Sequence, residues 1–156
     1  MEATAADVTM YLQDPVIQDH IESGVARAFS ECGAEETVVI GHSLGSIVAY
    51  RMLRRGGLIE CPVKALFTIG SPLGIRAIRE SLEPISHPPT VGGWFNAYDE
   101  RDVVALNPLD TKNFPVQPSI RNFGGVENGS PNHHGISGYL SDPIVARWIE
   151  QELRTP

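Results

Sequence analysis

The spacing of apolar residues along the chain predicts alternating helices and strands. The clearest helical stripe has an apolar side chain at every fourth position: Ile17, Ile21, Val25 and Phe29. Such a repeat predicts a helix with one buried face. Asp14 as N-cap and Pro15 at the first helical position predict where this helix begins, and Gly33 predicts where it ends.

Short, almost continuously apolar runs predict the strands, at residues 37–40, 63–69, 94–98 and near 119–123. Helices are expected to follow at three places: after the first strand to about residue 55, over residues 73–82, and from Asp142-Pro143 through Leu153. Apolar strands alternating with helices are typical of a parallel sheet covered on both faces. The expected fold class is therefore α/β, in a single domain over residues 1–156.

A Gly-x-Ser-x-Gly motif joins the first strand to its helix, through Gly41, His42, Ser43, Leu44 and Gly45. A strand, a sharp turn and a helix in this order predict a nucleophile elbow, which exposes the serine at the end of the sheet. We expect a strained backbone at the serine. We also expect both glycines to be required, because a Cβ at either position would clash, and the histidine to pack beside the site.

A serine hydroxyl needs a base to take its proton and a carboxylate to orient that base. In enzymes with a nucleophile elbow the chain order is serine, acid, histidine. Here Ser43 is followed by Asp99 and Asp102 after the third strand, and by the pair His133-His134 before the last helix. The helix that starts after Ser43 would offer the Leu44 N–H to a developing oxyanion.

These segments resemble the α/β-hydrolase superfamily, in its bacterial lipase- or esterase-like form. Four stretches carry the resemblance: residues 41–46 (GHSLGS), 68–74 (TIGSPLG), 94–104 (WFNAYDERDVV) and 134–140 (HGISGYL). The resemblance implies Ser43 as nucleophile, and it favours Asp102 over Asp99 as the acid because an Asp-x-Val turn follows the family's strand. It favours His134 over His133 as the base, and it implies no cofactor and no metal.

A full hydrolase of this kind has further strands before the first expected helix. The resemblance therefore implies a truncated α/β-hydrolase fold in which the strand at residues 37–40 is an edge. Exposed edges are seldom left bare, so we expect a second copy of the chain or a missing N-terminal partner to cover it. The second oxyanion donor normally comes from an early loop that is absent here.

Composition excludes several other function classes. The formal net charge of −7 over 156 residues argues against a nucleic-acid partner. No apolar run is long enough for a membrane span, and no export signal begins the sequence, so a cytoplasmic location is expected. Cys32 and Cys61 form no motif and are expected to be free thiols.

The sequence thus predicts a serine hydrolase that cleaves a carboxylic ester or related acyl substrate through an acyl-enzyme on Ser43. Thioester or amide cleavage and acyl transfer use the same residues and stay open. The alternative is a non-catalytic interaction subunit, or half of a split hydrolase that is inactive alone.

Overall fold

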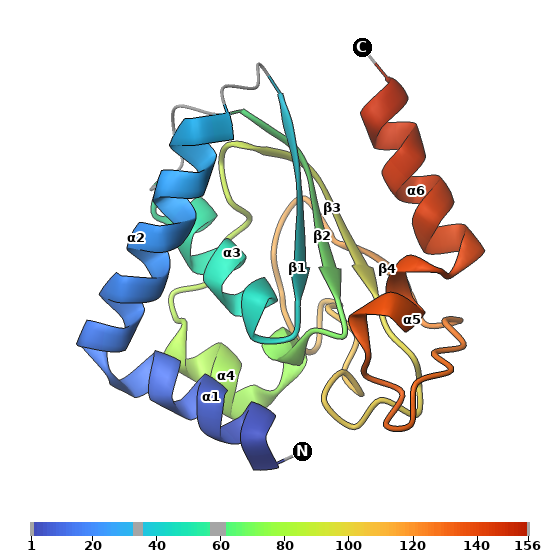
Figure 1. The fold of residues 1–156 in the computed structure, drawn as a ribbon, viewed down its shortest axis with the longest axis horizontal. Helices are drawn as coiled ribbons and strands as arrows, with labels where there is room; N and C mark the ends of the chain where they lie inside the picture. The colour runs from blue at the N-terminus through green and yellow to red at the C-terminus, as the bar shows by residue number, and fades with distance from the viewer. Residues whose placement is uncertain (1, 33–35, 57–61, 156) are drawn as a thin grey trace.

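The computed structural model describes residues 2–32, 36–56 and 62–155 (Figure 1). Along the chain, the elements are α1 (Glu2–Gln13), α2 (Pro15–Cys32), β1 (Thr37–His42), α3 (Leu44–Arg54), β2 (Val63–Ile69), the 3-10 turn η1 (Pro72–Gly74), α4 (Arg76–Ser81), β3 (Val91–Ala97), β4 (Arg121–Phe123), α5 (Ile136–Leu140) and α6 (Pro143–Arg154).

The four strands form one parallel sheet in the order β1-β2-β3-β4. Helices α2 and α3 cover one face of the sheet and α6 covers the other (Figure 1). Alternate residues of a strand point to opposite faces, so Leu66 packs in the core beneath α3 while Ala65 and Phe67 pack toward Trp148 of α6. The α/β class and the parallel sheet predicted from the sequence are confirmed.

Two helix starts lie where the sequence predicts them. The Asp14 carboxylate accepts hydrogen bonds from the N–H groups of Val16 (2.9 Å) and Ile17 (3.3 Å) ahead of α2. Asp142 likewise caps α6. In both cases a side-chain oxygen satisfies N–H groups that the first turn of a helix leaves unpaired.

Other expectations need correction. Helices α1 and α5 were not predicted, and the single helix expected at residues 73–82 is divided into η1 and α4. The third strand begins at Val91 rather than residue 94 and ends at Ala97. The predicted helix end at Gly33 and the predicted free thiols of Cys32 and Cys61 lie outside the part of the chain that the structure describes.

Strand β1 is an edge of the sheet, because among the described strands it pairs only with β2. Its residue Ile40 is 40% exposed, which is high for an apolar strand residue. The expectation that a second copy or an N-terminal partner covers this edge stays a prediction. Within the described parts of the chain, no helix combines the length and apolar character needed to cross a bilayer.

Candidate active site

Ser43 occupies a tight turn between strand and helix. Strand β1 ends at His42 and α3 begins at Leu44, so the serine alone makes the connection. Its φ of 51° and ψ of −125° lie in a region that non-glycine residues rarely adopt. The strained backbone expected at this position is present, and it directs Ser43 toward the carboxyl end of the sheet, where ligands bind in parallel α/β folds.

The two glycines of the motif differ in their surroundings. A Cβ at Gly41 would come within 2.7 Å of the Ser46 Cα and 2.9 Å of the Gly45 carbonyl oxygen, so this position requires glycine. A Cβ at Gly45 would meet no heavy atom within 4 Å apart from its chain neighbours and the backbone of its own helix. The expectation that both positions require glycine is therefore wrong for Gly45, which lies exposed in the first turn of α3.

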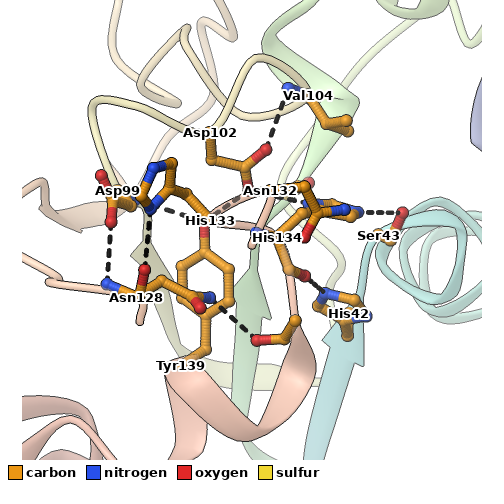
Figure 2. Close-up of polar contacts among 12 residues, drawn as sticks. His42, Ser43, Asp99, Asp102, Val104, Asn128, Asn132, His133, His134 and Tyr139 are labelled. Carbon is orange, nitrogen blue, oxygen red and sulfur yellow. Dashed lines mark hydrogen bonds and ion pairs between the residues drawn. The ribbon is translucent and has the colours of Figure 1, made fainter. Parts of the chain in front are cut away.

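Three of the predicted site residues form a hydrogen-bonded chain. The Ser43 Oγ lies 2.9 Å from the His134 Nε2, and the His134 Nδ1 lies 2.7 Å from the Asp102 Oδ2 (Figure 2). All three side chains are buried, Asp102 completely. A carboxylate only accepts hydrogen bonds, so the His134 Nδ1 carries the proton. This leaves Nε2 of the neutral ring able to accept the serine proton.

The Asp102 carboxylate has two further donors. The Tyr139 hydroxyl donates to Oδ2 at 2.5 Å, and the Val104 N–H donates to Oδ1 at 3.0 Å (Figure 2). Burial raises the pKa of Asp102, but the hydrogen bonds from His134, Tyr139 and Val104 outweigh it and leave the pKa below its ordinary value. Asp102 is therefore held as a carboxylate with a fixed orientation.

Asp99, the other candidate acid, makes a different set of contacts. Its Oδ2 accepts from the Arg101 guanidinium at 2.7 Å and from the Asn128 N–H at 2.8 Å. Neither oxygen bonds to His134. Asp99 also acts on the site indirectly, since its backbone N–H donates to the Tyr139 hydroxyl at 3.2 Å.

His133, the other candidate base, points away from Ser43. Its Nδ1 donates to the Asn128 carbonyl at 2.8 Å, and its φ of 55° turns the chain so that His134 faces the serine. The Asn128 side chain donates to the Gly135 carbonyl at 2.8 Å. The backbone and the side chain of Asn128 thus hold the loop at His133 and just after His134. The geometry thus brings His134, and not its neighbour, into the hydrogen-bonded chain.

His42 supports His134 from the elbow. Its Nε2 donates to the His134 carbonyl at 2.7 Å, and the two ring centroids are 4.8 Å apart. Burial lowers the pKa of His42, so a neutral ring with one N–H is favoured there. The sequence expectation that this histidine packs beside the site agrees with these contacts.

Tyr139 and Asn128 are the polar residues of this site that sequence reasoning missed. Both are fully buried. Tyr139 reaches the site through a long-range contact with Asp102, and Asn128 through contacts with His133 and Gly135 in the same loop. The described residues contain no cluster of three or more histidine, cysteine, aspartate or glutamate side chains suited to a metal ion.

We expect the ion pair of Asp99 to make stability depend on pH. The hydrogen bond from Arg101 is the main cause that lowers the pKa of Asp99 in the folded state. The pKa of Asp99 is lower in the folded protein than in the unfolded chain, where it is about 3.9, so its ionised form stabilises the fold above about pH 3.9. This stabilisation is lost progressively as the pH falls below that value. In urea unfolding, Asp99→Asn should therefore be less stable than wild type at pH 7, by a difference that shrinks at pH 3. A difference that stays constant would contradict this linkage.

The arrangement is one in which a buried carboxylate orients a histidine, and the histidine lies where it can accept a proton from a serine at the end of a strand. Leu44 begins α3, and the first N–H groups of a helix have no acceptor within the helix. Such a group beside Ser43 is free to bind a negative oxygen. Comparisons with protein-family models, curated proteins and solved structures found no match to this chain.

Proposed function

We propose that the protein is a serine hydrolase that cleaves a carboxylic ester or a related acyl substrate. The observation that carries the proposal is the continuous chain Asp102–His134–Ser43, with polar distances of 2.7 and 2.9 Å, at a strained serine. His134, 91 positions from Ser43 along the chain, meets the serine hydroxyl with Nε2, and Asp102, 59 positions from Ser43, bonds to the Nδ1 of the same ring. A structural role for Ser43 alone does not require this convergence.

The reaction follows from the proton positions. The Ser43 Oγ attacks the acyl carbon while the His134 Nε2 takes its proton, and the carbonyl oxygen becomes an oxyanion next to the Leu44 N–H. Asp102 stabilises the positive charge that His134 gains. The protonated histidine then donates that proton to the leaving oxygen, the bond from this oxygen to the acyl carbon breaks, and an acyl-enzyme remains on Ser43.

Deacylation repeats these steps with water as the nucleophile. The His134 Nε2 takes one proton from the water, whose oxygen attacks the acyl carbon of the ester on Ser43. Collapse of the oxyanion breaks the bond to the Ser43 Oγ, which recovers its proton from the histidine. The products are a carboxylic acid and the free enzyme, and no cofactor takes part in any step.

Covalent labelling tests the proposal without knowledge of the substrate. A fluorophosphonate reacts with an activated serine, so the intact mass of the wild-type protein should rise by one adduct. The Ser43→Ala protein should remain unlabelled, and Ser71→Ala is the matched control because Ser71 is a buried serine that bonds to Ser46 and not to His134. We expect Ser71→Ala to be labelled like wild type.

Absence of an adduct in the wild-type protein would overturn the proposal for this chain by itself. That result would favour the alternative of a non-catalytic interaction subunit or half of a split hydrolase. An adduct that persists in Ser43→Ala would show that another residue reacts, and the assignment of the nucleophile would be wrong.

A further inference from the structure

A large apolar pocket lies at the carboxyl end of the sheet, between α1, α4 and the loop after β3. Its volume is about 650 Å³, within the range typical of small-molecule sites. Nine of the described residues that line it are apolar and three are polar but uncharged. Figure 1 shows α1 and α4 near one another beyond the ends of the strands.

The pocket adjoins the candidate active site along the loop that carries Asp102. Val103 and Val104 line it, and they also line a smaller hollow of about 230 Å³ formed with Asp102 and His134. The two valines therefore border both the apolar pocket and the hollow beside the hydrogen-bonded chain Asp102–His134–Ser43, called the relay below. Val103 is 49% exposed.

The end of β2 makes a second connection. A Cβ on Gly70 would lie 3.3 Å from both the Asp102 Oδ2 and the His134 Cε1, so the chain passes directly against the relay at this residue. Two residues later, Pro72 lines the apolar pocket. The segment after β2 and the loop after β3 therefore each border both the relay and the apolar pocket.

Helix α1, which forms one wall, is fixed to the rest of the fold. Its fully buried residue Tyr11 donates from its hydroxyl to Glu22 of α2 at 2.6 Å, and Glu22 in turn bonds to Arg51 of α3 at 3.2 Å. Val8 of the same helix is buried and faces the pocket. The wall is therefore part of the packed structure.

We propose that this pocket binds the aliphatic chain of the ester substrate, an inference that rests on the proposed hydrolase function. Apolar walls favour a hydrocarbon, and the described lining residues include no charge that would pair with an ionic substrate group. The same chemistry fits a chain on the acyl side or on the alcohol side of the ester. The substrate class is therefore an ester with a medium-length hydrocarbon chain.

Two ester series distinguish these sides. The first is p-nitrophenyl esters from acetate to octanoate, which lengthen the acyl chain, and the second is alkyl acetates from ethyl to octyl. In the series whose chain enters the pocket, kcat/KM should rise about fourfold per buried methylene until the pocket is full. A flat response in both series from an active enzyme would overturn the proposal.

A substitution that fills the pocket supplies the structural test. Ala77 is an exposed residue of α4 that lines the pocket, and Ala146 is an exposed alanine of α6 on the opposite face of the sheet. Ala77→Trp should lower the ratio of octyl to short-chain kcat/KM at least about tenfold, whereas Ala146→Trp should leave the ratio unchanged. Equal ratios in both variants would contradict the assigned pocket.

A binding measurement separates failure of the pocket from failure of the hydrolase. Calorimetric titration with 1-octanol needs no turnover, so it applies even to a protein that a fluorophosphonate does not label. We expect binding to the wild-type and Ala146→Trp proteins and at least tenfold weaker binding to Ala77→Trp. Octanol binding without fluorophosphonate labelling would support the pocket and contradict the proposed hydrolase function. Labelling without octanol binding would support the hydrolase function and contradict the pocket.

Discussion

Replacing Asp102 with asparagine is expected to lower kcat about 10⁴-fold while the protein stays folded. The carboxylate accepts from the His134 Nδ1 at 2.7 Å, the Tyr139 hydroxyl at 2.5 Å and the Val104 N–H at 3.0 Å. An asparagine has one acceptor oxygen and an NH₂ group that only donates. At this fully buried position, the NH₂ group would either lie against the N–H of His134 or the hydroxyl of Tyr139, or force His134 into the tautomer that has its proton on Nε2.

The wrong tautomer abolishes the first proton transfer. With a proton on Nε2, the ring cannot accept from the Ser43 hydroxyl across the 2.9 Å contact. Loss of the negative charge also removes the stabilisation of the imidazolium that forms during attack. Both the turnover of a short-chain p-nitrophenyl ester and the rate of fluorophosphonate labelling should report the loss.

Asp99→Asn is the matched control, because it changes the same functional group three residues earlier in the chain. Its carboxylate bonds to Arg101 and Asn128 and makes no contact with the histidine. We expect less than a tenfold change in kcat. If Asp99→Asn loses more activity than Asp102→Asn, the acid is misassigned.

Local patterns were sufficient to predict the elements with the strongest periodic signals. Strand β2 lies at residues 63–69 as expected, because its mostly apolar run, in which Lys64 and Thr68 are the polar residues, matches a strand buried on both faces. Helix α2 has both a capped start and a regular apolar stripe. Helix α1 has neither an expected cap nor a broad stripe: among its described side chains the buried apolar ones are Val8 and Tyr11. A hydrogen bond from Tyr11 to Glu22 joins it to α2.

The candidate site could be predicted in its residue types and chain order but not in its contacts. The pairs Asp99 and Asp102, and His133 and His134, are too close in sequence for spacing to distinguish them, and the choice within each pair came from resemblance. In the structure the positive φ of His133 and the hydrogen bonds of Asn128 orient the loop. Such contacts depend on the folded arrangement of β3 and the following loops, which the sequence pattern does not specify.

The second large effect is expected at Gly41, where alanine should disrupt the turn that presents Ser43. The added Cβ would lie 2.7 Å from the Ser46 Cα and 2.9 Å from the Ser46 nitrogen, so it would collide with backbone of the first turn of α3. Strand β1 is fixed by its pairing with β2, with Gly41 opposite Thr68, and the strain must therefore move the helix and Ser43. We expect a loss of about 1–3 kcal/mol in unfolding free energy and of at least about 100-fold in kcat/KM.

Gly45→Ala is the control for this substitution, since it adds the same methyl group four residues later in the same motif. Apart from its chain neighbours and the backbone of its own helix, no heavy atom lies within 4 Å of the new Cβ, and the residue is already helical. Alanine in a helix is favoured over glycine by roughly 0.5–1 kcal/mol, so this variant should be at least as stable as wild type in urea unfolding. Equal losses in the two variants would show that the motif tolerates no side chain on either flank. A loss confined to Gly41→Ala would locate the steric requirement on the strand side of Ser43, where the close backbone contact lies.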